Sequence, residues 1–430
     1  MKKLLSIFWV MCLAVLPVYA EEETADPEML PEESAEPTPE PEPAYRVDAS
    51  SAVLMDKTSG NILFEQDKDN RIDPASLTKL MTVYLGIENL SDDKELSMTA
   101  EAFETYDHSF GVLWIEQGET MSASSAEHAA MLASANDTAA MIAEAVSSSQ
   151  DAFITKMNMA AAQFGMENTH FQNIFGIHND TNYSTAYDMA LLLRKALGNE
   201  TFRNIFGRAS YTIPATNFAV ARNLVNDCAL LRDTGYYYEK ATGGKIGNTP
   251  EGGFSLAATA KDDNGMELIA VVLGEENAAA AYNDIVSMFE YGFSNFQSIT
   301  FSAEDIGEKT VEVMRGKKHV ADVHFTNTGD YHVLLPTGLD ASTLTAEAVV
   351  NNEEETNPEV ITADVVFKLE DLVVGTTPMH REITYYDTSI AATAGPMIRQ
   401  YFNYASIGVL GLFIIRLFLK VIHKLLAPPA

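Results

Sequence analysis

Strand-like segments stand on both sides of a helical block within residues 45–298, and this order restricts the fold more than any other feature of the chain. The run "AVLMDKTSGNILFEQD" places two apolar segments around Asp56–Asn61, which is typical of a β-hairpin. Helical patterns follow in "SSAEHAAMLASANDTAAMIAEAV" and "STAYDMALLLRKAL", and strand-like runs return in "GGFSLAATA" and "MELIAVVLG". This order predicts α/β (α+β) layers with an antiparallel sheet flanked by helices. Ser124 and Glu127 have capping-box spacing and predict a helix start.

Residues 299–388 have a different character. The runs "VADVHF", "YHVLLP", "ADVVFKL" and "REITYYD" are short, rich in β-formers and separated by turn residues. We interpret this segment as a small β-sandwich domain.

The N-terminal segments do not belong to either domain. Residues 1–20 start with Lys2 and Lys3, continue with an apolar run and end in "PVYA", the pattern of a cleaved export signal; the run is short for a membrane-spanning helix. Residues 21–44 are dominated by Pro and Glu and lack aromatic residues, which predicts a disordered linker.

The C-terminal segment, residues 389–430, is interpreted as a linker and a membrane anchor. Residues from about 401 to 419 are predominantly apolar and contain Arg416, and Lys420 and Lys424 follow at helical spacing. A membrane-spanning helix with its basic end in the cytoplasm fits this pattern. The alternative is an amphipathic helix that lies in the membrane interface. Either arrangement tethers the exported chain to the extracytoplasmic face of the membrane.

Charge and metal-ligand spacing exclude several classes of protein. The formal net charge of −33 argues against nucleic-acid binding, which needs clustered Lys and Arg. No Cys/His spacing resembles a metal site, so neither a metal nor another cofactor is expected, and the nine scattered histidines are assigned structural roles. The bulky residues before Cys12 argue against lipid attachment. Once the export signal is cleaved, Cys228 has no partner for an internal disulfide.

The stretch "DPASLTKLMT", residues 73–82, places Ser76 three residues before Lys79. Asp73 is a good N-cap and Pro74 a good first helical residue, so Ser76 is expected in the first turn of a helix. Residues at i and i+3 share a helix face, so Lys79 can reach the Ser76 hydroxyl. A lysine acts as a base only when burial or a neighbouring cation lowers its pKa, and the apolar "LMTVYL" indicates a buried helix.

Two further motifs strengthen an otherwise weak Ser-x-x-Lys match. Ser-Ala-Asn at 134–136 lies between two helical runs, and Lys-Ile-Gly at 245–247 precedes a strand. Ser-x-x-Lys, Ser-Asp-Asn and Lys-Thr-Gly form the motif set of the penicillin-interacting serine enzymes, and the three motifs of this chain appear in the same order.

The chain therefore resembles the low-molecular-weight penicillin-binding proteins, the serine D-alanyl-D-alanine carboxypeptidases. The resemblance covers about residues 48–298 and rests on "DPASLTKLMT", "LASANDTAAMIAE", "MNMAAAQFGMENTHFQNIFGI", "YSTAYDMALLL" and "GGKIGNTPEGGFSLAAT". It implies a penicillin-binding/β-lactamase-like transpeptidase fold for residues 45–298. It also implies an enzyme that removes the terminal D-alanine from peptidoglycan stem pentapeptides and is acylated by β-lactams.

The resemblance also implies roles for the motif residues. Ser76 would be the nucleophile, Lys79 its general base, and Ser134 a proton relay to the leaving D-alanine. Asn136 would hold the substrate amide, and Lys245 would supply positive charge near Ser134 and the substrate carboxylate. The backbone N–H groups of Ser76 and of a residue on the strand after Lys245 would form the oxyanion hole.

The third motif departs from the family pattern, which is usually Lys-Thr-Gly. Ile246 replaces the threonine and cannot donate a hydrogen bond to the substrate carboxylate, although Gly247, for close approach of the substrate backbone, and Thr249 are in place. An arginine that the family often carries soon after Gly274 is also missing. The loss of one charge-assisted hydrogen bond costs about 1.5–3 kcal/mol, or roughly one to two decades in rate. Thr249 is the candidate to substitute in part.

Two alternatives to the carboxypeptidase stay open, of which the first is motivated by these departures. One is a non-catalytic or altered-substrate (endopeptidase-like) protein that binds cell-wall peptides. The other is a serine β-lactamase, which needs a Glu to activate the deacylating water; Glu167 is present in "GMENTHFQNIF", but Phe171 stands where an asparagine is usual.

Overall fold

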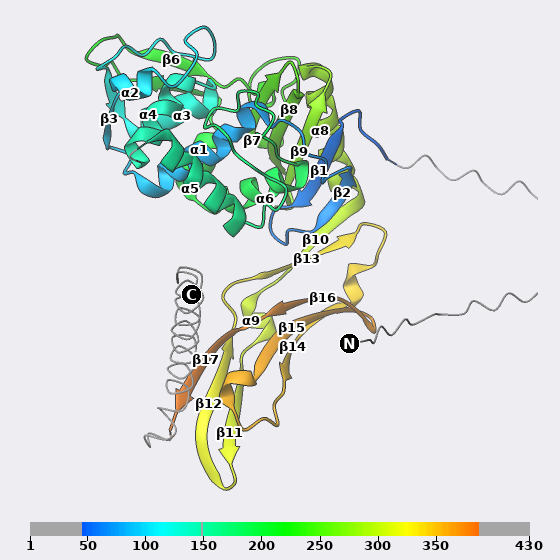
Figure 1. Cartoon of the computed structure of the whole chain (residues 1–430). Helices are drawn as coiled ribbons and strands as arrows, with labels where there is room; N and C mark the ends of the chain where they lie inside the picture. The colour runs from blue at the N-terminus through cyan, green and yellow to red at the C-terminus, as the bar shows by residue number, and fades with distance from the viewer. Residues whose placement is uncertain (1–44, 148, 387–430) are drawn as a thin grey trace, which may run out of the picture. The chain divides into compact units, whose positions relative to one another are not determined.

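The computed structural model describes residues 45–147 and 149–386. An antiparallel five-stranded sheet in the order β2-β1-β9-β8-β7 forms the framework of the first domain (Figure 1). Its strands are β1 (Ser51–Asp56), β2 (Ile62–Gln66), β7 (Ala241–Thr249), β8 (Gly253–Lys261) and β9 (Glu267–Glu275). The predicted hairpin is confirmed as β1 and β2, and the two later strand predictions are confirmed as β8 and β9. The first strand of the domain therefore pairs with its last.

Both faces of this sheet are covered. A Cβ on Gly292 of α8 (Ala278–Asn295) would lie 2.9 Å from Leu54 Cδ2, so Leu54 faces α8. Its neighbour Val53 belongs instead to the hydrophobic cluster formed with the other helices. Leu54 and Val53 contact different helices because successive residues of a strand point to opposite faces of the sheet. The predicted sheet flanked by helices is thus present, with α6 (Ala186–Ala196) packed against β1 and β9.

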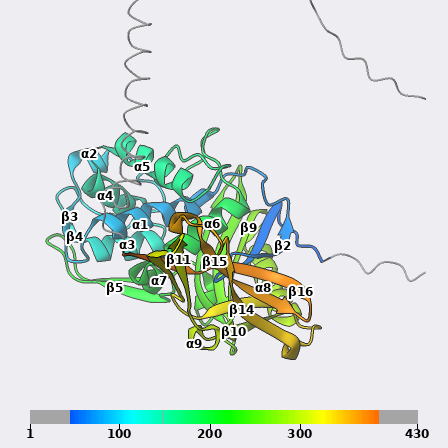
Figure 2. The ribbon, with the colours of Figure 1, turned by 90° about the horizontal axis from the view of Figure 1, so that it is seen from below.

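The remaining helices gather around α1, as Figures 1 and 2 show. The helices of this group are α1 (Thr78–Asn89), α2 (Ala100–Phe103), α3 (Ala123–Leu132), α4 (Asn136–Val146), α5 (Gln150–Gln163) and α7 (Glu200–Phe206). The same domain contains the 3₁₀ turn η2 (Ala229–Leu231) and two short antiparallel strand pairs, β3 (Glu95–Ser97) with β4 (Thr120–Ser122) and β5 (Ser210–Ile213) with β6 (Arg222–Val225). Every residue of α1 from Thr78 to Gly86 is buried. The predicted burial of this helix is confirmed.

The predicted capping box at the start of α3 is wrong. The N-cap is Ser122, two residues before the predicted Ser124, and its Oγ accepts the backbone N–H of Ser125 at 3.2 Å. Ser122 ends β4 in an extended conformation, the backbone geometry that an N-cap requires. Glu127 is buried inside the domain, and this burial raises its pKa to about 8.

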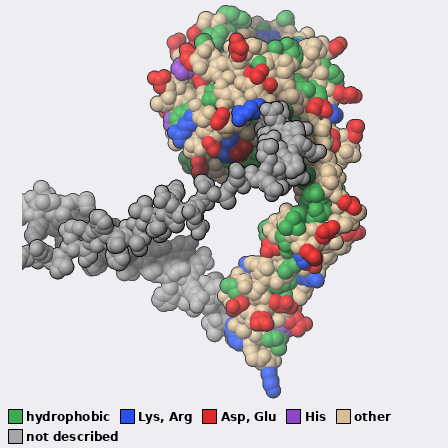
Figure 3. Space-filling model, turned by 90° about the vertical axis from the view of Figure 1, so that its right-hand side faces the viewer, with side chains coloured by type: hydrophobic (Ala, Val, Ile, Leu, Met, Phe, Trp, Pro, Cys, Tyr) green, Lys and Arg blue, Asp and Glu red, His purple; other side chains and the backbone are tan. Residues whose placement is uncertain are grey.

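Residues 296–385, called the second domain below, are built from antiparallel strands. Its elements are β10 (Phe296–Phe301), α9 (Ala303–Ile306), β11 (Lys309–Arg315), β12 (Lys318–Thr326), β13 (Tyr331–Pro336), η3 (Ala341–Thr343), β14 (Leu344–Asn351), η4 (Pro358–Val360), β15 (Thr362–Leu369), β16 (Leu372–Pro378) and β17 (His380–Tyr385). Two three-stranded sheets, β11-β12-β17 and β14-β15-β16, share one core that includes Val323 and Phe325 from one sheet and Val365 and Phe367 from the other. This arrangement has the two layers of the predicted β-sandwich. Acidic side chains are scattered over the face in Figure 3 and form no single patch there.

Several predicted segments lie outside the described residues: the export signal (1–20), the linker (21–44) and the C-terminal linker and membrane anchor (389–430). Within residues 45–147 and 149–386, no helix combines the length and apolarity needed to cross a membrane.

Candidate active site

Ser76 lies in the 3₁₀ turn η1 (Ala75–Leu77), which leads directly into α1. The helix start differs from the prediction, because the α-helix proper begins only at Thr78. Asp73 still satisfies a backbone donor of this turn: its Oδ1 accepts the N–H of Ala75 at 3.0 Å. Ala75 has φ 48°, in the left-handed region that a β-carbon disfavours. Such backbone outliers concentrate at functional sites.

Lys79 reaches the Ser76 hydroxyl from the next turn. Its Nζ lies 3.4 Å from Ser76 Oγ and donates to the carbonyl oxygen of Phe175 at 2.6 Å. The residue is 1% exposed. Burial and, secondly, the charge of Lys245 lower the pKa of Lys79 well below its usual value and outweigh two nearby carboxylates. A neutral amine at hydrogen-bond distance from a hydroxyl can accept its proton.

A second serine–lysine pair faces the first. Ser134 lies between α3 and α4 with φ 54°, and Lys245 of β7 donates a hydrogen bond from Nζ to Ser134 Oγ. Lys245 is as deeply buried as Lys79, and burial lowers its pKa to about 8. The two motifs are brought together although 111 positions separate Ser134 from Lys245.

Asn136 is the first residue of α4 and fixes one wall of the site. Its Nδ2 donates to the carbonyl oxygen of Phe110 at 3.3 Å, and its backbone N–H donates to the carbonyl of Gly111 at 2.6 Å. The adjacent Asp137 accepts the backbone N–H of Leu113 at 2.7 Å. These bonds hold the loop that begins at Phe110 against the start of α4.

Strand β7 passes so close to the nucleophile turn that Gly247 has no room for a side chain. A Cβ there would lie 2.5 Å from the backbone N of Ser76. The hydroxyl of Thr249 lies 3.5 Å from Asp73 Oδ2 and accepts the Gly252 N–H at 2.9 Å. Thr249 is therefore already engaged in the wall of the site.

These residues surround one cavity of about 640 Å³. Of the seven predicted site residues, Ser76, Lys79, Ser134, Asn136, Gly247 and Thr249 line it, and Lys245 reaches it through its bond to Ser134. Ile246 also lines the cavity and presents only hydrocarbon to it. The structure thus gathers all three sequence motifs at one place.

Two titratable residues that line the cavity, Asp227 and His178, had no predicted site role. Asp227 lines the cavity and opposes the lowering of the Lys245 pKa. His178 lines it as well, and its Nδ1 lies 2.9 Å from Oδ2 of Asp73. The sequence pattern predicted only a helix cap for Asp73 and structural roles for the histidines. One sequence feature could have pointed to His178 as a site residue: it directly follows the segment "HFQNIFGI", which is part of the family resemblance.

The residues on which the β-lactamase alternative depends lie elsewhere. Glu167 is exposed and does not line the cavity, and Phe171 is buried in the hydrophobic core. Glu167 is therefore not placed to activate a water next to Ser76.

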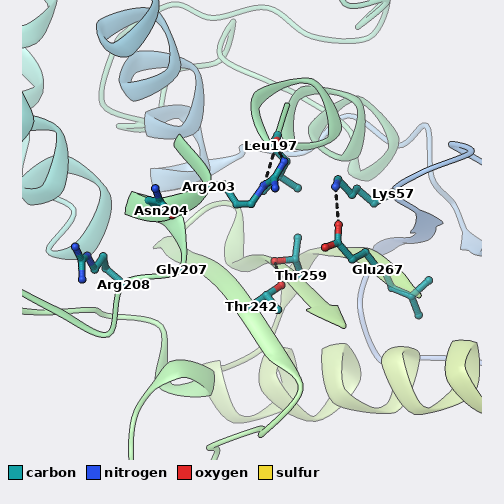
Figure 4. A pocket seen from close by; sticks show the side chains of 10 residues that line it. Lys57, Leu197, Arg203, Asn204, Gly207, Arg208, Thr242, Thr259 and Glu267 are labelled. Carbon is teal, nitrogen blue, oxygen red and sulfur yellow. Dashed lines mark hydrogen bonds and ion pairs between the residues drawn. The ribbon is translucent and has the colours of Figure 1, made fainter. Parts of the chain in front are cut away.

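A second cavity, of about 520 Å³, lies near the start of β7 and is lined in part by Thr242 (Figure 4). Three of its charged groups have partners: Lys57 Nζ lies 2.5 Å from Glu267 Oε2, and the Arg203 guanidinium donates to the carbonyl oxygen of Leu197. None of the predicted site residues lines this cavity.

Comparisons with known proteins agree with this geometry. A family model described as D-alanyl-D-alanine carboxypeptidase matches residues 35–277, which include all seven predicted site residues. The chain is 29% identical over 304 residues to the D-alanyl-D-alanine carboxypeptidase DacF of Bacillus subtilis, covering 70% of this chain and 76% of the relative. It is 30% identical over 305 residues to DacC of Escherichia coli, covering 69% and 73%.

Solved structures show the same similarity. Penicillin binding protein 5 of Haemophilus influenzae superposes with a TM-score of 0.66 at 25% identity, over 78% of this chain and 97% of that one. A variant of the Streptomyces K15 DD-transpeptidase superposes with a TM-score of 0.54 at 27% identity, over 58% and 99%.

Proposed function

Because the chain belongs to the D-alanyl-D-alanine carboxypeptidase family and is a serine-type carboxypeptidase, we propose that Ser76 attacks the carbonyl between the two terminal D-alanines of a peptidoglycan stem pentapeptide. The reaction forms an acyl-enzyme on Ser76 and releases D-alanine. One observation carries this assignment: the Ser76 hydroxyl lies 3.4 Å from the buried Lys79 amine.

Acylation begins with proton transfer from Ser76 to Lys79. The lowered pKa of Lys79 provides the neutral amine that this step needs. The carbonyl oxygen gains negative charge as the tetrahedral intermediate forms. In this proposal, backbone N–H groups of Ser76 and of β7 beyond Lys245 stabilise this charge; the close approach of β7 to the Ser76 backbone supports this role.

Ser134 and Lys245 protonate the leaving D-alanine in this proposal. The leaving nitrogen needs a proton, and Ser134 Oγ can relay one because Lys245 donates to it. With a pKa lowered to about 8, Lys245 gives up a proton more easily than an ordinary lysine.

The substrate lies along β7 in this proposal. β7 is the last strand in the order of the five-stranded sheet, so an extended peptide can add to its outer edge. Asn136 holds a substrate amide from the opposite wall, and Lys245 attracts the terminal carboxylate. β-Lactams acylate Ser76 in the same cavity.

The non-catalytic or endopeptidase-like alternative rests on Ile246. An apolar side chain here weakens the contact with the terminal carboxylate, but Ser76 and Lys79 remain paired, so acylation persists. The family membership favours the carboxypeptidase.

The enzyme acts on peptidoglycan outside the cytoplasm. We further propose that the export signal over residues 1–20 directs it there and that residues 389–430 anchor it to the membrane. The apolar run at 401–419 with basic residues around its end supports this anchor.

The test combines a covalent label with product release. Full-length protein is incubated with labelled penicillin, and mass spectrometry locates the adduct; D-alanine release from a pentapeptide is measured in parallel. We expect Ser76→Ala to lose both signals, while the exposed Ser97→Ala of β3 retains both. D-Alanine release by Ser76→Ala at the rate of the unmodified enzyme would contradict the assignment.

A further inference from the structure

A buried carboxylate orients an imidazole that lines the same cavity as the nucleophile. Asp73 Oδ1 accepts the N–H of Ala75, the residue before Ser76, and Oδ2 lies 2.9 Å from His178 Nδ1. The Asp73 side chain is 6% exposed, whereas that of His178 is 36% exposed. Asp73 therefore ties the imidazole to the turn that carries Ser76 and leaves the ring accessible from the cavity.

The second ring nitrogen of His178 is available for chemistry. An ionised carboxylate only accepts hydrogen bonds, so Nδ1 carries the proton toward Asp73 and Nε2 keeps its lone pair in the neutral ring. The closest acidic group to Nε2 is Asp180 Oδ1 at 3.7 Å, on a fully exposed side chain. This is the arrangement of a general base that a third group orients.

Hydrolysis of the acyl-enzyme needs such a base. After D-alanine leaves, a water must attack the acyl carbon. The titratable residues among the described ones that line the cavity are Lys79, Asp227 and His178. Lys79 is held between Ser76 and the carbonyl of Phe175, and Asp227 lies within the electrostatic reach of Lys245. His178 alone of these combines an orienting partner with an exposed ring.

We propose that His178, oriented by Asp73, is the general base of the deacylation step; this inference rests on the proposed function. The oxygen of a cavity water bonds to the acyl carbon while His178 Nε2 takes one of the water's protons. The tetrahedral intermediate then collapses, the bond between the acyl carbon and Ser76 Oγ breaks, and the proton on Nε2 returns to Oγ. The products are the free peptide acid and the regenerated serine.

The charges around His178 determine its pKa and therefore the pH range in which the neutral ring can act as a base. The groups that face it are Asp73, which makes the largest contribution through the hydrogen bond, and the carboxylates of Glu251 and Asp180. Together they raise the pKa of His178 above its ordinary value. The neutral ring therefore accumulates only as the pH rises through this raised pKa, and deacylation accelerates in that range.

The experiment separates the two half-reactions in the full-length enzyme. Labelled penicillin forms the adduct on Ser76, excess unlabelled penicillin is added, and the decay of the label is followed at several pH values. We expect His178→Gln to form the adduct at an unchanged rate and to lose it about 10²-fold more slowly, the lower range for general-base catalysis, without the rise toward alkaline pH.

Two further variants test the assignment. His319→Gln is the matched control, because His319 forms a similar half-exposed pair with Asp322 on β12 in the second domain; it is expected to leave both rates unchanged. Asp73→Asn retains a cap acceptor but loses the ionised partner of the imidazole. We expect it to shift the alkaline rise of the decay rate to lower pH, which a purely structural defect would not do.

Specific outcomes overturn the inference. Decay of the His178→Gln adduct at the original rate and with the original pH profile excludes His178 as the base. An effect limited to adduct formation or to the KM of the peptide excludes it as well. Absence of any adduct in the unmodified chain would overturn the proposed function, and the inference with it.

Discussion

At the scale of single residues, burial of two lysines makes the candidate site reactive. Lys79 and Lys245 are each 1% exposed, and the loss of hydration favours the neutral amine in both. The charge of Lys245 lowers the pKa of Lys79 further. Each then has a serine hydroxyl to bind, Ser76 for Lys79 and Ser134 for Lys245.

The replacement of threonine by Ile246 gives a prediction at the same scale. Ile246→Thr restores a hydroxyl in the cavity, which can donate to the terminal carboxylate of the substrate. A hydrogen bond to a charged group contributes about 1.5–3 kcal/mol, so kcat/KM for D-alanine release should rise roughly 10- to 100-fold. The measurement is steady-state kinetics with a pentapeptide.

Ile246→Val is the matched control for this substitution. Valine has the shape of threonine but no hydroxyl, so it tests the hydrogen bond separately from the volume change. We expect its kcat/KM to remain within a few-fold of the original value. Equal gains in the threonine and valine variants would refute the hydrogen-bond explanation.

At the scale of elements, a loop and a strand clamp the nucleophile turn. A Cβ at Gly176, which has φ 83°, would overlap the carbonyl oxygen of Ala75, and a Cβ at Gly247 would press on the backbone N of Ser76. The turn η1 can therefore occupy its position only between two residues without side chains. Its strained conformation at Ala75 is held by this close packing.

Gly247→Ala tests this clamp. The added methyl group would lie 2.5 Å from Ser76 N, so β7 and the turn must separate. We expect penicillin acylation to slow at least tenfold, together with a loss of about 1–3 kcal/mol in the free energy of unfolding. Stopped-flow labelling and thermal unfolding measure the two effects.

Gly375→Ala provides the comparison, because Gly375 also lies in an edge strand, β16, and a Cβ there would meet Phe367 only at an ordinary 3.7 Å. This variant should acylate at the original rate. Normal acylation of Gly247→Ala would mean that the close approach of β7 is not required for catalysis.

At the scale of the whole molecule, the proposed C-terminal anchor predicts where the enzyme is found. Strand β17 ends at Tyr385, and the N–H of Tyr386 still donates to the carbonyl of Val320, so a chain that ends at residue 388 retains the contacts of the second domain. Removal of residues 389–430 should release the enzyme from the membrane fraction with its carboxypeptidase activity unchanged. Fractionation with labelled penicillin measures both properties.

Deletion of residues 21–44 is the control for this truncation, because this acidic segment contains too little apolar surface to bind a membrane. It should leave the distribution between fractions unchanged. Recovery of the full-length chain in the soluble fraction without detergent would refute the anchor.

The local features of the site were accessible to sequence analysis because they depend on spacing. Ser76 and Lys79 are three residues apart, so helical geometry alone predicts that they meet. Alternating and continuous apolar runs likewise predicted the β1–β2 hairpin, β8, β9 and the burial of α1. The capping box at Ser124 failed because the extended end of β4 offers Ser122 as the better cap.

The amino-acid sequence alone was enough to predict the β1–β2 hairpin, the helical runs, β8, β9, the Ser–Lys spacing and, through the resemblance to a known family, the class of enzyme. It placed the Lys-Ile-Gly motif before a strand, whereas the motif lies within β7. Lys245 meets Ser134 from 111 positions away, as the resemblance implied, but the contact of His178 with Asp73 from 105 positions away is visible in the folded chain alone. The spacing of apolar residues along the sequence predicts which face of a helix or strand is buried, but it does not predict which distant element packs against that face. The pKa values of Lys79 and Lys245 depend on this packing, because burial is the largest cause of both shifts.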